Sequence, residues 1–115
     1  MIEPPPIYVQ QHVGLLFREF ILRVIFAAQM LPVGFQVQPT SWFRDIAHNA
    51  RVGGAVRSQH LLGLALDLVV QSSADVGVLD RALHSADLVV IREPDHVHVQ
   101  LLQAGILPGS LFRDL

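Results

Sequence analysis

Two short segments of this chain alternate between apolar side chains and side chains of another kind. Along a strand, successive side chains point to opposite faces. In LGLALDLVV, residues 62–70, one face therefore carries leucines and the other carries Gly63, Ala65 and Asp67. In HVHVQLL, residues 96–102, His96, His98 and Gln100 lie opposite valines and a leucine. We expect two strands that each turn one face to the core, and Gly63 and Ala65 leave room beside Asp67.

The rest of the chain supplies helices and further strands. In chain order we expect a helix from Tyr8 to Met30, a strand from Phe35 to Pro39, a turn from Asn49 to Gly54 and a strand from Leu62 to Val70. A second helix follows, capped by Ser72, Ser73 and Asp75, with Val76, Leu79, Leu83 and Ala86 on one side. Two further strands run from Asp87 to Ile91 and from His96 to Leu102. This order predicts an α+β fold in which a small antiparallel sheet packs with helices.

Composition limits the possible functions. The 115 residues suit a single domain spanning residues 1–115, and the 51% of apolar residues argues against a disordered chain. A formal charge of −2 without lysine or a basic cluster argues against nucleic-acid binding. There is no cysteine, so any metal would be bound by His, Asp or Glu. The apolar excess suggests an exposed apolar patch or a partner, and it leaves the oligomeric state open.

The N-terminal part argues against export and against membrane insertion. Met1–Pro6 holds an acid and three prolines where a signal peptide has a basic region. The most apolar stretch, Val13–Met30, contains Arg18, Glu19 and Arg23, which are costly to place in lipid. We therefore expect no signal peptide and no membrane span, and synthesis in the cytoplasm.

Three residues on the polar faces suit a metal site. If the two strands pair side by side, His60 could join Asp67 and His98 as ligands. Two histidines and one carboxylate, with a fourth position left to water, are typical of a catalytic zinc site. Spacing alone leaves two alternatives open. A histidine is often a surface or hydrogen-bonded core residue, and an aspartate in an apolar strand can be paired with an arginine.

The motifs resemble those of a known family. Ser58–Asp67 (SQHLLGLALD) resembles the S-x-H-x-x-G-x-A-x-D signature of the zinc D-alanyl-D-alanine carboxypeptidase family. That family includes phage L-alanyl-D-glutamate endolysins and shares its fold with the Hedgehog signalling domain. Ser41–Arg44 is similar to its S-G-Y-R segment, Asn49–Ala55 to its N-x-x-V-G-G-A turn, and Asp95–Val99 to its closing D-H-x-H strand.

The resemblance implies a role for each matching position. His60, Asp67 and His98 would bind zinc, Asp95 would be the general base, Arg44 would steady the substrate carbonyl, Ser58 would support the ligands or touch substrate, and His96 could donate a proton or contact substrate. Zinc lowers the pKa of a bound water to about 7, and a nearby carboxylate can take its proton.

The sequence also departs from the family. Asp95 stands where many members have glutamate, Val97 where they have tryptophan, and Trp42 where they have glycine. A shifted register, with Glu93 as base and His96 as ligand, fits the same spacing. We favour His98 because it lies between two valines, as an inward ligand on a strand should, and Pro94 suits the first residue or the edge of that strand.

The resulting hypothesis is a zinc peptidase of the bacterial cell wall. It would hydrolyse amide bonds in peptidoglycan stem peptides through a zinc-activated water, as an endolysin-type endopeptidase or as a DD-carboxypeptidase. Without a signal peptide it would reach the wall after phage-type release. The alternative is a catalytically inactive, zinc-bearing binding module on the same fold.

Overall fold

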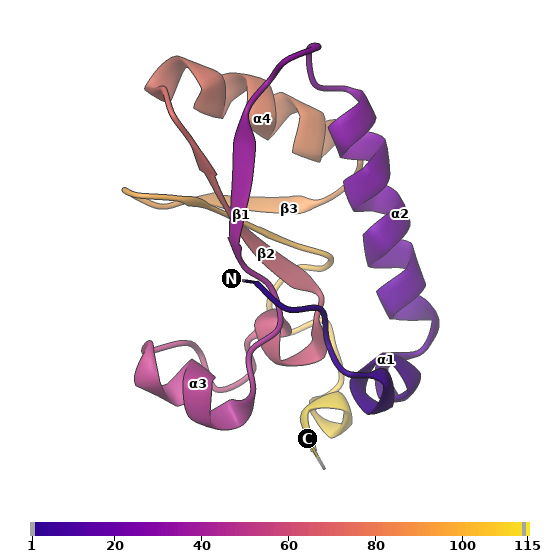
Figure 1. The fold of residues 1–115 in the computed structure, drawn as a ribbon. Helices are drawn as coiled ribbons and strands as arrows, with labels where there is room; N and C mark the ends of the chain where they lie inside the picture. Colours follow the sequence, from indigo (N-terminus) through magenta and orange to yellow (C-terminus); the bar gives the residue numbers. More distant parts are fainter. Residues whose placement is uncertain (1, 114) are drawn as a thin grey trace.

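The structure, a computed structural model, describes residues 2–113 and 115 and contains a four-stranded antiparallel sheet (Figure 1). Its strands are β1 (Val37–Ser41), β2 (Ala65–Val70), β3 (Val89–Arg92) and β4 (Val97–Gln100), in the spatial order β1-β2-β4-β3. The strands β2 and β4 are central neighbours, which is the pairing that the candidate metal site required. The α+β fold class is thereby confirmed.

The helices are α1 (Ile7–Val13), α2 (Leu15–Gln29), α3 (Ile46–Arg51) and α4 (Ser73–Ser85), with short 3-10 helices η1 (Gln59–Leu62) and η2 (Gly109–Phe112). Of these, α2 and α4 bury one face of the sheet, whereas α1 and α3 contact η1. Helices α2 and α4 contact each other and enclose the core with the sheet (Figure 1). The core includes Phe20, Ala27, Leu66, Leu68, Leu79, Leu83, Val97 and Val99. In the described part of the chain, no helix is both long enough and apolar enough to cross a membrane.

The expected single helix from Tyr8 to Met30 is wrong, because Gly14 divides it. Gly14 has φ 67° and ψ −135°, a conformation outside the helical region that glycine adopts readily. Val13 at the end of α1 and Phe20 in α2 are both buried. The apolar period therefore runs across the break and hides it from a sequence reading.

The expected strand limits also shift. Phe35 donates its N–H to the Pro32 carbonyl in a turn, so β1 begins at Val37 instead of Phe35. Asp87 has φ 58° just after α4, so β3 begins at Val89. The strand expected from His96 to Leu102 is only the central part, β4, because His96 belongs to the turn that joins β3 to β4. Pro94 lies in that turn and is not the first residue of a strand.

Gly63 has a different role from the one expected. It is the left-handed cap of η1, with φ 70°, and β2 begins two residues later. A Cβ atom at this position would overlap the ring of Pro5, which is buried. The space beside Gly63 is therefore filled by the N-terminal segment and does not form part of the metal site.

Gly63→Ala is expected to lower the free energy of unfolding by about 2–5 kcal/mol. A left-handed conformation costs an L-residue about 1–2 kcal/mol, and overpacking costs about 1–3 kcal/mol more. The control is Gly105→Ala, because Gly105 has φ 83° but nothing within 4 Å of the added Cβ. Urea unfolding measures both variants. Equal losses in the two variants would show that the Pro5 contact has no energetic effect.

Candidate metal centre

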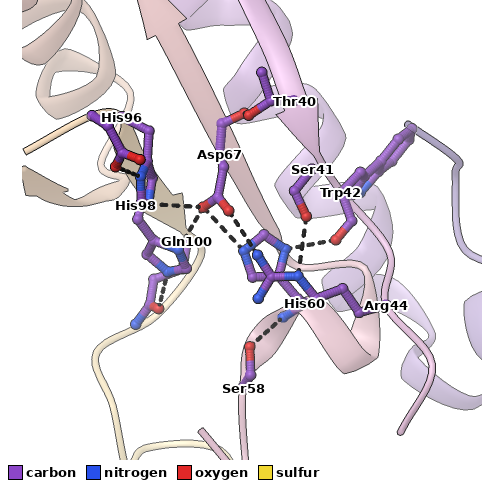
Figure 2. Close-up of polar contacts among 11 residues, drawn as sticks. Thr40, Ser41, Trp42, Arg44, Ser58, His60, Asp67, His96, His98 and Gln100 are labelled. Atoms are coloured by element: carbon purple, nitrogen blue, oxygen red, sulfur yellow. Dashed lines mark hydrogen bonds and ion pairs between the residues drawn. The ribbon is translucent and has the colours of Figure 1, made fainter. Parts of the chain in front are cut away.

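The pairing of β2 with β4 brings two of the predicted ligands together. Asp67 lies directly opposite His98 in the register, on the sheet face away from α2 and α4. Asp67 Oδ1 is 3.1 Å from His98 Nδ1 and 3.2 Å from His60 Nε2 (Figure 2). His60 comes from η1, which leads into β2 through the Gly63 turn. The structure thus brings together the three residues that the sequence singled out.

The three donor atoms fit one metal ion. They lie within 4.8 Å of one another, and His60 and Asp67 are buried. Tetrahedral ligands about 2.0–2.1 Å from zinc are about 3.3 Å from each other, close to the two distances that Asp67 Oδ1 makes with the imidazoles. Two imidazoles and a carboxylate are also the donor types that zinc takes. That these residues bind a metal remains a prediction.

Backbone contacts set the orientation of His60. Its Nδ1–H donates to the Trp42 carbonyl over 2.6 Å, which leaves Nε2 directed at Asp67. The Arg44 N–H donates to the His60 carbonyl, and Ser58 Oγ accepts from the His60 N–H, so both main-chain groups of His60 are held in place. A metal-binding histidine commonly donates its second ring N–H in this way.

Trp42, which stands where the family has glycine, turns its ring away from the candidate site. The indole stacks on Phe17 with ring centres 6.4 Å apart, and its N–H donates to the Gly63 carbonyl. The substitution therefore adds bulk to the packing against α2, while the main chain of Trp42 still supports His60.

Arg44 is bonded to the candidate ligand Asp67. Its guanidinium donates to Asp67 Oδ2 over 2.8 Å and to Ser41 Oγ over 3.1 Å. An irregularity in the pairing between Pro39 and Ser41 places Ser41 opposite Asp67. The resemblance assigned Arg44 to the substrate carbonyl, and the structure adds this contact with the carboxylate.

Two pKa shifts follow from this cluster. Burial alone would raise the pKa of Asp67, but the hydrogen bonds from His60 and His98 outweigh burial and hold that pKa well below its ordinary value. Burial alone would lower the pKa of His98, but the hydrogen bonds to Asp67 and Gln100 outweigh burial and raise it. Without a metal, Asp67 is thus ionised, and its negative charge favours the protonated form of His98.

The remaining predicted residues lie on the turn between β3 and β4. His96 Nε2 is 3.8 Å from Asp67 Oδ1, and His96 Nδ1 is 2.7 Å from Asp95 Oδ1. This contact lowers the pKa of Asp95, whose side chain is 88% exposed. Asp95 therefore lies next to His96 and does not contact the three candidate ligands. His98 belongs to the cluster, which favours the His98 register over the one with His96 as ligand.

The cluster opens into a cleft of about 600 Å³. The cleft is lined by residues of the loop 52–58, by Glu93 and His96, and by Arg44 together with the three candidate ligands. Buried Asn49 holds the loop, because its side chain donates to the Ala55 carbonyl and its own carbonyl accepts from the Gly54 N–H. A Cβ atom on Gly54 would overlap the Asn49 side chain, which accounts for the glycine at this position.

The sequence analysis missed two residues that support the site. Gln100 Oε1 is 2.7 Å from His98 Nε2, and Gln59 makes two hydrogen bonds to the main chain of Leu102. Both glutamines are buried. The sequence had already placed Gln100 on the same strand face as the histidines. Its position two residues after His98 was therefore the signal that could have identified it.

An α+β domain with two histidines and an aspartate at the base of a cleft defines a candidate metallohydrolase. A family model described as peptidase M15 matches residues 26–100, about two-thirds of the chain, and the chain belongs to this family. The matched range contains every predicted site residue. Comparisons with curated proteins and with solved structures gave no match. Membership indicates a metallopeptidase domain and confirms the resemblance seen in the motifs.

Proposed function

We propose that this chain is a zinc-dependent peptidase that hydrolyses amide bonds in peptidoglycan stem peptides. The observation that carries the proposal is the convergence of His60, Asp67 and His98 at a cleft, in a member of a peptidase family. A bound zinc ion would supply Lewis acidity and lower the pKa of a bound water to about 7. The substrate class rests on the resemblance of Ser58–Asp67 to carboxypeptidases and endolysins of the bacterial wall.

Arg44 would serve both the metal site and the substrate. Its hydrogen bond to Asp67 Oδ2 holds the carboxylate so that Oδ1 faces the histidines. The guanidinium also lines the cleft, and it carries five N–H donors, more than its contacts with Ser41 and Asp67 use. The same cation can therefore stabilise the negative charge that develops on a substrate carbonyl in the transition state.

Asp95 and His96 would accept the proton of the attacking water and return it to the leaving amine. The hydrogen bond between them lowers the pKa of Asp95 and directs His96 Nε2 toward the cluster. A carboxylate within reach of an attacking water accepts its proton, and the conjugate acid returns it to the leaving amine. We assign Asp95 as the general base and His96 as its neighbour that contacts the substrate or the leaving group.

Metal removal tests the proposal. The purified chain is expected to carry one zinc ion by native mass spectrometry and to cleave purified muropeptides. A chelator should abolish cleavage and added zinc should restore it. Mass analysis of the products then separates an endopeptidase, which cuts within the stem, from a DD-carboxypeptidase, which releases D-alanine.

Two outcomes would contradict the proposal in different ways. A folded chain that takes up no zinc would show that the three residues are not a metal site. Zinc binding without cleavage of any muropeptide would support the inactive binding module instead. The 88% exposure of the Asp95 side chain is the feature that favours this second reading.

A further inference from the structure

The imidazole of His98 is held at both of its nitrogens. Nδ1 lies 3.1 Å from Asp67 Oδ1, and Nε2 lies 2.7 Å from Gln100 Oε1 (Figure 2). His98 and Gln100 are two residues apart on β4, so their side chains share one face of the strand. Gln100 is only 7% exposed, and its amide therefore needs partners within the protein.

The orientation of the Gln100 amide follows from its second contact. Its other end is 2.7 Å from the Leu102 carbonyl, which can only accept a hydrogen bond. The NH₂ group therefore faces Leu102, and the oxygen faces His98. An amide oxygen also only accepts, so Nε2 of His98 must carry the hydrogen.

A second glutamine fixes the main chain that orients the first. Gln59 Nε2 donates to the same Leu102 carbonyl over 2.6 Å, and the Leu102 N–H donates back to Gln59 Oε1 over 3.3 Å. Gln59 immediately precedes His60, so this pair of bonds ties η1 to the end of β4. The chain of contacts from Gln59 through Leu102 and Gln100 thus joins the two segments that carry the candidate histidine ligands.

The two histidines are consequently held in opposite tautomers. His60 keeps its hydrogen on Nδ1, against the Trp42 carbonyl, and presents Nε2. His98 keeps its hydrogen on Nε2, against Gln100, and presents Nδ1. The other nitrogen of each ring faces Asp67 Oδ1: it donates to that oxygen while it carries a hydrogen, and it would lose this hydrogen when a metal binds, as a ligand atom must.

We propose that Gln100 is a positioning residue that holds His98 in the tautomer whose Nδ1 binds the metal. This inference rests on the proposed function, because the metal is the one assigned there. Outer contacts of this kind commonly change metal affinity 10–100-fold, roughly the size of effect expected here.

The test compares two variants that differ in the acceptor. Gln100→Met removes the oxygen at similar length and is expected to weaken zinc binding about 10–100-fold. Gln100→Glu keeps an oxygen at His98 but loses the NH₂ group that donates to the Leu102 carbonyl, so its zinc affinity should lie between those of the methionine variant and the wild type. Zinc affinity is measured by competition with a chromophoric chelator. Nitrogen NMR of the zinc-loaded chain reads the tautomer and should show the hydrogen on His98 Nε2.

Further measurements separate positioning from folding and from the proposed function. Urea unfolding of the metal-free variants detects a simple loss of stability, which would not be reversed selectively by glutamate. Undiminished affinity in Gln100→Met, or a hydrogen on His98 Nδ1 in wild type, would overturn the inference while zinc binding stands. A wild-type chain that binds no zinc would overturn the proposed function and this inference together.

Discussion

Asp67→Asn is expected to lower the affinity for zinc by at least about 100-fold, the upper end of the effect of changing an outer contact. The carboxylate contacts both histidines through Oδ1 and supplies the negative charge that offsets a divalent ion. Asparagine keeps the shape of the side chain but removes that charge. Competition with a chelator measures the affinity, and circular dichroism verifies that the fold is retained.

Asp80→Asn is the matched control for Asp67. Asp80 is also paired with an arginine, Arg92, but it lies on α4, outside the residues that line the cleft. Its replacement should leave zinc affinity unchanged. Undiminished zinc binding in Asp67→Asn would exclude this cluster as the metal site.

The complete removal of the Asp67 carboxylate should also cost stability. In Asp67→Ala the Arg44 guanidinium, 14% exposed, loses its carboxylate partner. Loss of one member of a buried ion pair typically costs about 3–5 kcal/mol. Urea unfolding should show a smaller loss of free energy of unfolding in Asp67→Asn than in Asp67→Ala. The difference between the two variants would measure the contribution of the space that the side chain fills, apart from that of its charge.

The central geometry of the site could be predicted from the sequence. A strand repeats every two residues, so the leucine row in β2 and the valines of β4 fix which way Asp67 and His98 face. A slip of one residue would bury the polar row, and burial of one face therefore specifies the register strongly. The motif around His60 then placed the third residue just before the strand.

The turns and breaks could not be predicted, because a glycine can continue a helix or strand or can adopt a positive φ that ends it. Gly14 lies within an unbroken apolar period, and nothing in that period shows that it adopts a positive φ instead of continuing the helix. Gly63 occupies a position that alternation assigns to the strand, but it caps η1 and packs on Pro5. The partner in that contact is 58 residues away in the sequence, out of reach of any local pattern.

The outer contacts of the histidines were equally hidden. His60 is oriented by the carbonyl of Trp42, and every residue has such a carbonyl, so it leaves no mark in the sequence. Gln100 could be placed on the face of His98, but its role depends on the Leu102 carbonyl, whose position is set by the end of β4. Side-chain spacing predicted the candidate ligands, whereas tertiary structure determines which nitrogen each one presents.

Asp95→Asn is expected to reduce kcat about 10²–10⁴-fold while zinc stays bound. General acid–base catalysis contributes about this much, and asparagine cannot accept the proton. Because the Asp95 side chain is 88% exposed, the unfolding midpoint should not change. Steady-state hydrolysis of a muropeptide gives kcat, and native mass spectrometry gives the zinc content of the same sample.

Glu93→Gln is the control that decides between the two registers. Glu93 lies on the same turn and lines the cleft, so it would be the base if His96 were the ligand. We expect only a small change in kcat, because His98 and not His96 lies within 3.1 Å of Asp67 Oδ1. A large loss in Glu93→Gln with normal activity in Asp95→Asn would instead identify Glu93 as the base. The shifted register would further require that His96→Ala releases the zinc and that His98→Ala retains it.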